Sequence, residues 1–354
     1  MYHLLFAVLF YFYVNQAGGD AKNYWFTVKE NLDIGIIDYI ELGFGTYFMY
    51  ALNYLPSGVM DLTFFTGSIF YALIGYFGFV YLYIVFKERI KYNTYIFKIP
   101  LFPTILFLPN LHFWSSNVGK DTLLFFCIAL LFYAIKSPKQ HIWKILLSLG
   151  LAYLVRPHIA AYLIAAFGVA LLLDANLKLY KKLFIMAIIV AGFALIFDSL
   201  VAYLRIDSFD IDTIMSYSED KVTKLSRDHT GSSVDISSYS YPLKVFTFLY
   251  RPLFIDGLSA FGLLASLENL ILIILSVKLL LTNPWRYLKK SNSFVKALII
   301  FFLLGALTFS LILGNLGIML RQKNMFIPAL LFICLWTFSY HTEVKTSNQV
   351  TPTN

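Results

Sequence analysis

A series of apolar runs, each bounded by charged residues, constrains the fold of this chain more than any other feature. The runs lie near residues 2–16, 62–86, 97–114, 121–136, 145–155, 159–173, 183–204, 257–281, 295–314 and 325–340. Most approach the ~20 residues that a helix needs to cross the ~30 Å hydrocarbon core of a bilayer. Hydrophobic residues make up 59% of the chain and charged residues 14%, which leaves too little polar surface for a soluble fold. The sequence therefore predicts an all-α, polytopic bundle of about ten transmembrane helices in a lipid bilayer.

Basic residues gather in four of the segments between the runs and set the expected orientation. These segments lie at 87–91, 136–144, 178–182 and 286–296. Loops rich in Lys and Arg face the cytoplasm, and alternation of the spans places all four there. Most carboxylates then lie outside, in loops at about 17–61 and 205–243. We expect a single integral membrane domain over residues 1–340, followed by a short polar cytoplasmic tail at 341–354.

Two stretches depart from a simple succession of spans. Residues 47–55 are apolar, but as an additional span they would place the basic segment 87–91 outside, so we expect an interfacial or re-entrant helix there. The runs 145–155 and 159–173 are short for spans, and Pro157 between them removes a backbone donor. We expect two tilted helices that meet at a break, and a single kinked helix is the alternative.

Composition and motifs exclude several classes of protein. The net charge of +8 comes from cations in loops between spans, so it indicates membrane orientation and no nucleic-acid partner. Cys127 and Cys334 each lie within an apolar run and predict neither a disulfide nor a thiolate metal site. Motifs of P-loop nucleotide hydrolases, zinc proteases and serine hydrolases do not occur. Residues 2–16 lack the basic start and cleavage site of a secretory signal, so we expect a retained span.

Arg156 interrupts the apolar stretch from Leu146 to Leu173, in the sequence Leu-Val-Arg156-Pro157-His158. A charged side chain in membrane-embedded sequence costs roughly 2.5–3.5 kcal/mol on insertion scales, and such residues commonly mark functional sites. A helix break at this depth is tolerated only where it is buried in protein or lines a wet cavity. We therefore expect Arg156 to hold an anionic, lipid-linked substrate. The structural alternative is an arginine that binds backbone carbonyls at the break.

Further cations lie at the expected outer ends of apolar runs, where the positive-inside rule disfavours them. One occurs in a Trp-Ser-Ser-Asn-Val-Gly-Lys-Asp turn, one in a second Arg-Pro pair, and two between the last two runs. Guanidinium groups match phosphate oxygens with paired hydrogen bonds, and an ammonium adds a point charge. We predict that one outer pocket holds the phosphate or pyrophosphate of a polyprenyl carrier through Lys120, Arg156, Arg251, Arg321 and Lys323.

These cations also have structural alternatives. Asp121 suits the N-terminus of a helix, which would make Lys120 and Asp121 an ordinary capped turn. Arg251 has Asp256 shortly downstream and would simply pair with it. The whole set would otherwise extend to the outer lipid headgroups, as long basic side chains commonly do.

The candidate catalytic groups are His158 and Asp20, which follows two glycines directly after the first run. Either would deprotonate a sugar hydroxyl, since carboxylates and imidazoles both serve as general bases. Asp20 would alternatively bind a divalent cation or act only as a turn residue. Asp198 and Glu268 lie within apolar runs, where an acid serves proton coupling in a carrier or pairs with an arginine.

Four short motifs are spread over most of the chain. They are Gly-Asp20-Ala-x-x-Tyr24, Trp114-Ser-Ser-x-x-Gly-Lys120-Asp121, Arg156-Pro-His158 and Leu320-Arg321-Gln-Lys-Asn-Met-Phe-Ile-Pro328. Together they resemble the multi-spanning glycan-assembly proteins of bacteria, namely the GT-C glycosyltransferases and the polysaccharide polymerases of the Wzy (O-antigen polymerase) or EpsG type.

The resemblance implies glycosyl transfer from an undecaprenyl-linked donor at the outer face of the bacterial cytoplasmic membrane, in the assembly of a surface polysaccharide. An acid near the first run is the base in the GT-C case, and arginines hold pyrophosphate in the polymerase case. This chain has the single Asp20 where GT-C proteins usually show an acidic pair, and Gly168 lies one residue too far from Arg156 for the polymerases' Arg-x10-Gly pattern. A divalent cation at Asp20 is the one cofactor considered, and other glycan-assembly proteins are expected partners.

Two other classes of function compete with this hypothesis. A carrier or flippase for a lipid-linked oligosaccharide also needs cations, but it would distribute them through the bundle and often has inverted repeats, which we do not detect. A non-catalytic assembly subunit would have its cavity closed or absent.

Overall fold

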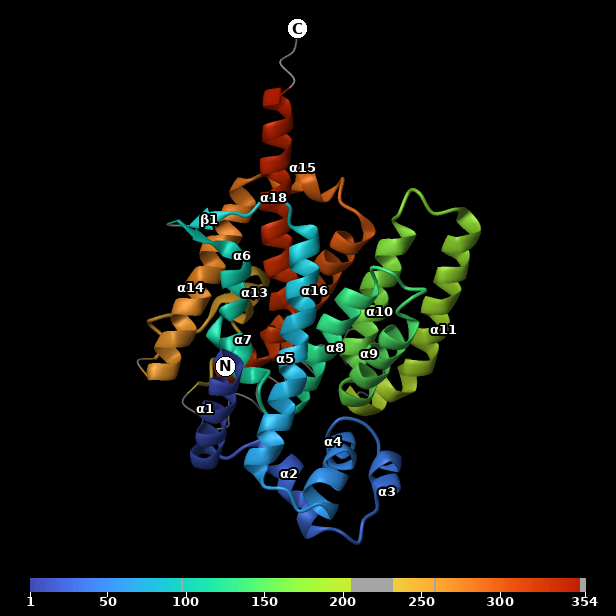
Figure 1. Ribbon diagram of the computed structural model, residues 1–354, viewed down its shortest axis with the longest axis vertical. Helices are drawn as coiled ribbons and strands as arrows, with labels where there is room; N and C mark the ends of the chain where they lie inside the picture. The colour runs from blue at the N-terminus through green and yellow to red at the C-terminus, as the bar shows by residue number, and fades with distance from the viewer. Residues whose placement is uncertain (97, 205–231, 258, 351–354) are drawn as a thin grey trace. The chain divides into compact units, whose positions relative to one another are not determined.

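The computed structural model describes residues 1–96, 98–204, 232–257 and 259–350 (Figure 1). This part of the chain is mostly helical, and its strands are the short antiparallel pair β1 (Tyr95–Ile96) and β2 (Ile99–Pro100). The expected all-α class is therefore confirmed. Most of the predicted outer loop 205–243 and the side chain of Asp198 lie outside the described residues.

The helices belong to two compact units. Unit 1 comprises residues 1–85 and 109–161, and unit 2 comprises residues 86–108 and 162–354. Unit 1 contains α1 (Tyr2–Ala17), α2 (Asp20–Glu30), α3 (Ile36–Glu41), α4 (Thr46–Asn53), the π-helical turn η1 (Tyr54–Val59), most of α5 (Phe64–Arg89), α7 (Pro109–Trp114), α8 (Lys120–Ala134), α9 (Ile142–Val155) and the start of α10 (Pro157–Leu172). A single membrane domain over residues 1–340 stays a prediction.

Unit 1 is centred on α8. All residues of this helix except Phe126 and Tyr133 are buried. A helix that is apolar on every side is stable only when other elements surround it, and α8 packs along α9. The hydroxyl of Ser148 in α9 donates to the carbonyl of Cys127 in α8 at 2.6 Å. The first turn of α8 is polar but is buried as well, so its charged residues lie in the protein interior.

Unit 2 is organised around α18. Its elements are β1, β2, α6 (Leu101–Thr104), η2 (Ile105–Phe107), the rest of α10, α11 (Leu179–Leu204), α13 (Tyr241–Tyr250), α14 (Ala260–Leu281), α15 (Pro284–Leu288), α16 (Ser293–Ile312), α17 (Leu316–Gln322), η3 (Lys323–Met325) and α18 (Ile327–Val350). α14, α15 and α16 all pack against α18. A Cβ at Gly305 in α16 would overlap the ring of Phe326, which is fully buried directly before α18. This close approach holds the turn before α18 inside the unit.

Four helices in the described part of the chain are long and apolar enough to cross a membrane: α5, α14, α16 and residues Ile327–Thr346 of α18. α9 and α10 are apolar but shorter. The chain is thus a membrane protein with several apolar helices, while the number of ten spans is not confirmed. α18 continues to Val350, so most of the expected polar tail at 341–354 extends the last helix.

The prediction of one continuous span at 97–114 is wrong. The segment contains β2, α6, the 3-10 turn η2 and α7 instead. Pro100, Pro103 and Pro109 account for the interruptions, because proline lacks a backbone donor and disfavours helical geometry in the residue before it. Residues 47–55, by contrast, are helical as expected, in α4 and η1, and their depth in the membrane stays a prediction.

The predicted break between the two short apolar helices is present. α9 ends at Val155 and α10 begins at Pro157, with Arg156 in extended geometry between them (φ −151°, ψ 96°). Proline suits the first position of a helix, where its missing N–H leaves no hydrogen bond unmade. The chain therefore has two helices here rather than one kinked helix, and Arg156 is at their junction.

α5 approaches the turn before α8 so closely that Gly75 has no room for a side chain. A Cβ at Gly75 would overlap the backbone carbonyl oxygen of Ser115, which cannot rotate away. We expect Gly75→Ala to lower the free energy of unfolding in detergent by about 1–3 kcal/mol. Gly150→Ala in α9 is the control, since a Cβ there meets no atom within 4 Å. That control should be neutral or stabilising by about 1 kcal/mol, because alanine favours a helix over glycine. Wild-type stability of Gly75→Ala would contradict this packing.

Candidate functional site

The predicted site residues fall in both units. Unit 1 contains Asp20, Lys120, Arg156 and His158, and unit 2 contains Arg251, Arg321 and Lys323. A pocket shared by the two sets stays a prediction, whereas the geometry within each unit is defined.

Arg156 is buried and ion-paired in unit 1. Its Nη2 lies 3.1 Å from Oδ1 of Asp121, and the two side chains are 7% and 5% exposed. Asp121 is the second residue of α8 and Arg156 follows the last residue of α9, so the pair joins adjoining ends of two packed helices. Removing one member of a buried ion pair leaves an uncompensated charge, so the loss of either Arg156 or Asp121 would destabilise the protein.

Lys120 is the first residue of α8 and is also buried. Its Nζ donates to the hydroxyl of Thr46 at 3.0 Å and lies 5.4 Å from the ring centroid of Tyr24, within range of a cation–π interaction. Thr46 begins α4 and Tyr24 lies in α2. The segment 17–61 therefore supplies groups around this ammonium.

His158, in the first turn of α10, belongs to the same cluster. Lys120 adjoins Asp121 in sequence and His158 follows Arg156 by two residues, so the ion pair of Asp121 with Arg156 brings the three basic side chains into one region. The charges of Arg156 and Lys120 both act on the ring of His158. We refer to Lys120, Asp121, Arg156 and His158 as the basic cluster. Cations gathered in a largely buried place concentrate positive potential far more than the same cations in water.

Asp20 lies at the exposed edge of this region. It is the first residue of α2, one helical turn before Tyr24, whose ring faces Lys120. Residues four apart are neighbours on one face of a helix. Asp20 is therefore on the face of α2 that also carries the aromatic contact to the basic cluster.

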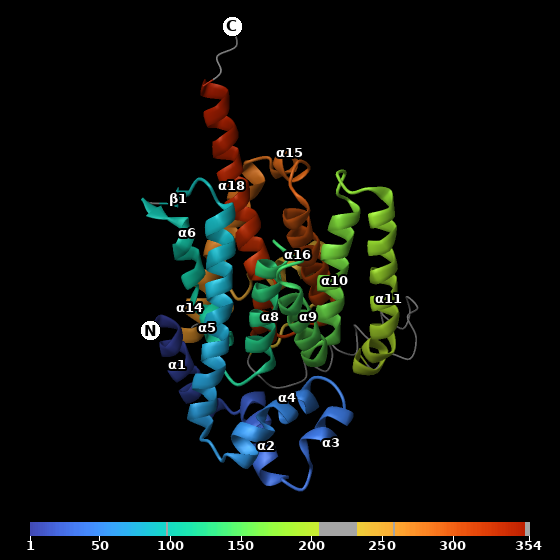
Figure 2. The same cartoon turned by 45° about the vertical axis from the view of Figure 1, so that its right-hand side comes forward.

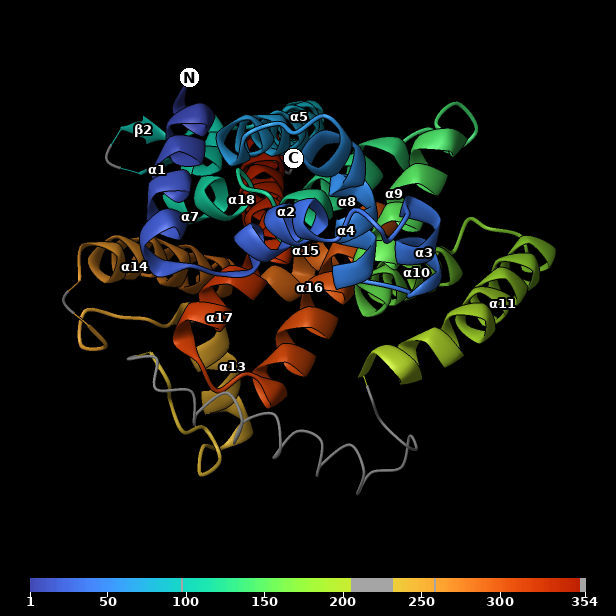
Figure 3. The ribbon, with the colours of Figure 1, turned by 90° about the horizontal axis from the view of Figure 1, so that it is seen from below.

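The connection between α3 and α4 lies over the end of α9. Gly45 donates its backbone N–H to the carbonyl of Leu154 at 2.8 Å, and the rings of Phe44 and Tyr153 pack edge to face at 4.9 Å. Figures 1 and 3 show α2, α3 and α4 gathered at the ends of α8 and α9. The segment 17–61 thus lies beside the basic cluster and covers one side of it.

The turn before α8 positions Lys120 through its own hydrogen bonds. The hydroxyl of Thr122 donates to the carbonyl of Asn117 at 2.7 Å, and the side-chain amide of Asn117 donates to the carbonyl of Trp114 at 3.1 Å. A Cβ at Gly119 would come within 2.6 Å of Oδ1 of Asn117, so a larger residue there would displace the amide of Asn117. The Trp-Ser-Ser-x-x-Gly-Lys motif therefore forms a buried, closely packed turn that presents Lys120.

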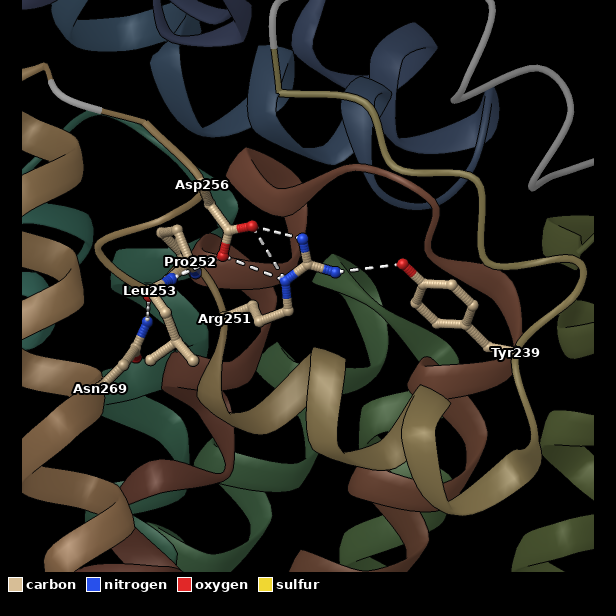
Figure 4. A network of polar contacts seen from close by, with 6 residues as sticks. All are labelled: Tyr239, Arg251, Pro252, Leu253, Asp256 and Asn269. Carbon is tan, nitrogen blue, oxygen red and sulfur yellow. Dashed lines mark hydrogen bonds and ion pairs between the residues drawn. The ribbon is translucent and has the colours of Figure 1, made fainter.

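Arg251 forms a local ion pair in unit 2. Its Nε lies 3.0 Å from Oδ2 of Asp256, its Nη2 also contacts that carboxylate, and its Nη1 lies 3.4 Å from the hydroxyl of Tyr239 (Figure 4). Hydrogen bonding to the guanidinium lowers the pKa of Asp256, and the carboxylate raises the pKa of Arg251. The pairing expected as the structural alternative is therefore present, and a role of Arg251 in phosphate binding stays a prediction.

Lys323 is completely buried, although the sequence suggested an outward-facing cation. Its Nζ donates to the carbonyls of Leu249 (3.1 Å) and Arg251 (3.3 Å) and to Oδ1 of Asn269 (2.5 Å). Burial lowers the pKa of Lys323, and the negative charge of Glu268 opposes that shift. Close packing before α18 turns the side chain inward, where three acceptors converge on it.

The remaining expectations concern Arg321 and a metal. Arg321 is half-buried near the end of α17. Within the ranges that the structure describes, no group of three or more His, Cys, Asp or Glu is arranged to hold a metal ion. A divalent cation at Asp20 stays a prediction.

Sequence reasoning missed Asp121 as the partner of Arg156, and it missed Thr46 and Tyr24 as contacts of Lys120. The sequence does contain a signal for the pairing of Asp121 with Arg156. The consecutive apolar runs 121–136 and 145–155 have a short connection, which favours antiparallel neighbours and places the start of one beside the end of the other. No comparable pattern marks Thr46 or Tyr24, because both contacts depend on how α2 and α4 fold against α8.

Comparison with family models, curated proteins and solved structures finds no match to this chain.

Proposed function

We propose that this protein is a membrane glycosyltransferase or polysaccharide polymerase. Its donor is a sugar linked to polyprenyl phosphate, which it uses at the outer face of a bacterial cytoplasmic membrane to build a cell-surface polysaccharide. The observation that supports this most is the gathering of Lys120, Arg156 and His158 at the junction of α9 and α10.

The basic cluster suits the phosphate of such a donor. A guanidinium binds two phosphate oxygens at once, and an ammonium adds a point charge. The first turn of α8, which begins with Lys120, contributes the partial positive charge of its backbone amides. Preorganised cations in a water-poor site stabilise developing negative charge better than solvent does. In the reaction, the acceptor oxygen bonds to the anomeric carbon while the bond from that carbon to the phosphate oxygen breaks and the phosphate leaves as an anion.

The acceptor hydroxyl must also lose a proton, and Asp20 is the better placed of the two candidate bases. It is exposed at the start of α2, so an acceptor sugar reaches it from water. His158 lies among the cations themselves, where the donor phosphate is expected. The carboxylate therefore takes the proton at the edge of the site while the cations hold the phosphate within it.

Variants at the two candidate bases test this assignment. We expect Asp20→Asn to reduce polymer or glycolipid by about 100-fold or more, the usual effect of losing a general base. His158→Gln is expected to reduce it less. Product is quantified from surface polysaccharide and extracted lipid-linked intermediates in cells where the variant replaces the wild-type protein. Purified variants are also tested for stabilisation by undecaprenyl phosphate, which Asp20→Asn should retain.

Matched controls are available for both positions. Asp33→Asn removes another exposed acid from the same segment, and His141→Gln removes the imidazole at the opposite end of α9. Both should make normal amounts of product. Normal product from both Asp20→Asn and His158→Gln would overturn the catalytic assignment.

A carrier or flippase of lipid-linked oligosaccharide is the second candidate function, because unit 2 holds a buried acid and a buried base. Glu268 in α14 is 3% exposed, and its charge acts on Lys323. Acids and bases within apolar helices often mark substrate or proton pathways. Reconstituted vesicles distinguish the two: a new glycosidic bond supports the transferase, whereas movement of a polyprenyl-linked sugar between leaflets without bond formation supports the carrier.

A further inference from the structure

Two connections of unit 2, each with basic residues in it or directly beside it, are held together by a hydrogen bond. One joins α10 to α11 over residues 173–178, and the other joins α14 to α16 through α15 over residues 282–292. Oδ2 of Asp174 in the first loop accepts a hydrogen bond from the hydroxyl of Ser293, directly after the second, at 2.6 Å. Figures 1 and 2 show both connections at the same end of their helices. Cations far apart in the sequence therefore share one surface.

This surface carries a large excess of positive charge. Its basic residues are Lys178, Lys181, Lys182, Arg286, Lys289, Lys290 and Lys296. Asp174 is the one carboxylate in residues 173–182 and 282–296, and the charge of Lys296 acts on it. We refer to these basic residues as the basic patch. Such a concentration of cations attracts an anionic partner.

Exposed apolar and aromatic side chains stand among these cations. Trp285 is 69% exposed and Leu281 is 82% exposed, while Tyr180 and Leu179 at the start of α11 are 63% and 71% exposed. Tryptophan and tyrosine concentrate at the headgroup level of membranes, where one part of the ring meets lipid and the other meets water. A soluble anion would gain nothing from these side chains, whereas a lipid uses both the charge and the apolar surface.

A contact between Tyr287 and α18 fixes the orientation of α15. The hydroxyl of Tyr287, which is buried, lies 2.7 Å from Nδ1 of His341 in α18. With Tyr287 directed into the unit, Trp285, Arg286 and Lys289 remain exposed on the other faces of this short helix. The basic patch is thus held in place by packing against α18.

We propose that the basic patch is a binding site for the headgroups of anionic phospholipids. The phosphodiester of the headgroup contacts the lysines and Arg286, and the acyl chains run along Leu281 and Trp285. Clusters of cations directly beside apolar helices attract anionic membrane surfaces, and the attraction weakens with added salt. This site is separate from the basic cluster of unit 1 and does not depend on the proposed glycosyl transfer.

Lipid-dependent stability of the full chain in detergent tests the proposal. Phosphatidylglycerol is titrated against phosphatidylcholine and glycerol 3-phosphate, and the melting temperature is followed. We expect stabilisation by phosphatidylglycerol alone. Lys289→Gln combined with Lys290→Gln should raise the phosphatidylglycerol concentration for half-maximal stabilisation by roughly 10-fold or more, since each cation near an anionic surface contributes about 5-fold.

A second pair of lysines provides the matched control. Lys136→Gln combined with Lys139→Gln removes the same charge from exposed positions in another basic loop, after α8. This control should titrate like the wild-type protein. Equal weakening in the two double variants, equal stabilisation by phosphatidylcholine, or stabilisation by glycerol 3-phosphate alone would each overturn the assignment.

Discussion

Replacing Arg156 by alanine is expected to lower the free energy of unfolding by about 3–5 kcal/mol and to abolish the glycan product. Stability falls because Asp121, only 5% exposed, loses the guanidinium that lies 3.1 Å from its carboxylate. Product is lost because the proposed donor phosphate loses its main ligand. Unfolding in detergent measures the first effect, and product quantified per amount of membrane-inserted protein measures the second.

A double variant separates the structural effect from the functional one. Arg156→Ala combined with Asp121→Ala removes both charges, so that no uncompensated charge remains and most of the stability should return. The product should remain absent. Arg156→Lys keeps the charge but loses the paired hydrogen bonds, so it should retain partial activity. Normal product from the double variant would remove Arg156 from the mechanism, and wild-type stability of Arg156→Ala would contradict the ion pair.

Replacing Lys323 by methionine is expected to destabilise the protein by about 3 kcal/mol or more, because each buried acceptor left without a donor costs about 1–3 kcal/mol. The ammonium has three such acceptors, the carbonyls of Leu249 and Arg251 and Oδ1 of Asn269. Methionine is similar in length to the lysine stem, so the loss does not come from a large cavity. Unfolding by denaturant in detergent measures this loss of stability.

The exposed Lys289 is the matched control for this substitution. Lys289→Met should change stability by no more than about 0.5 kcal/mol, as is usual for surface positions. If Lys323 served instead as a phosphate ligand, Lys323→Met would keep wild-type stability and lose the binding of undecaprenyl phosphate. That outcome would contradict the structural role that its buried contacts indicate.

Local patterns in the sequence predicted several features correctly. The apolar runs predicted an all-α membrane protein, because a helix satisfies its own backbone hydrogen bonds in lipid. Pro157 predicted the break between α9 and α10 through its own missing donor. The pairing of Arg251 with Asp256 was foreseen as an alternative because the two residues are neighbours in sequence. The prediction of one span at 97–114 was wrong because average hydropathy does not register that proline interrupts a helix.

The amino-acid sequence by itself determined the helical class, the membrane character and the position of the break, since hydropathy and proline geometry act over one turn or one span. Only the tertiary structure decided which charges meet. Arg156 pairs with Asp121 because α8 and α9 pack together, and Lys323 turns inward because the segment before α18 packs through Phe326 against Gly305 of α16. Such contacts depend on the packing of whole helices, whose relative rotation and depth no local pattern specifies.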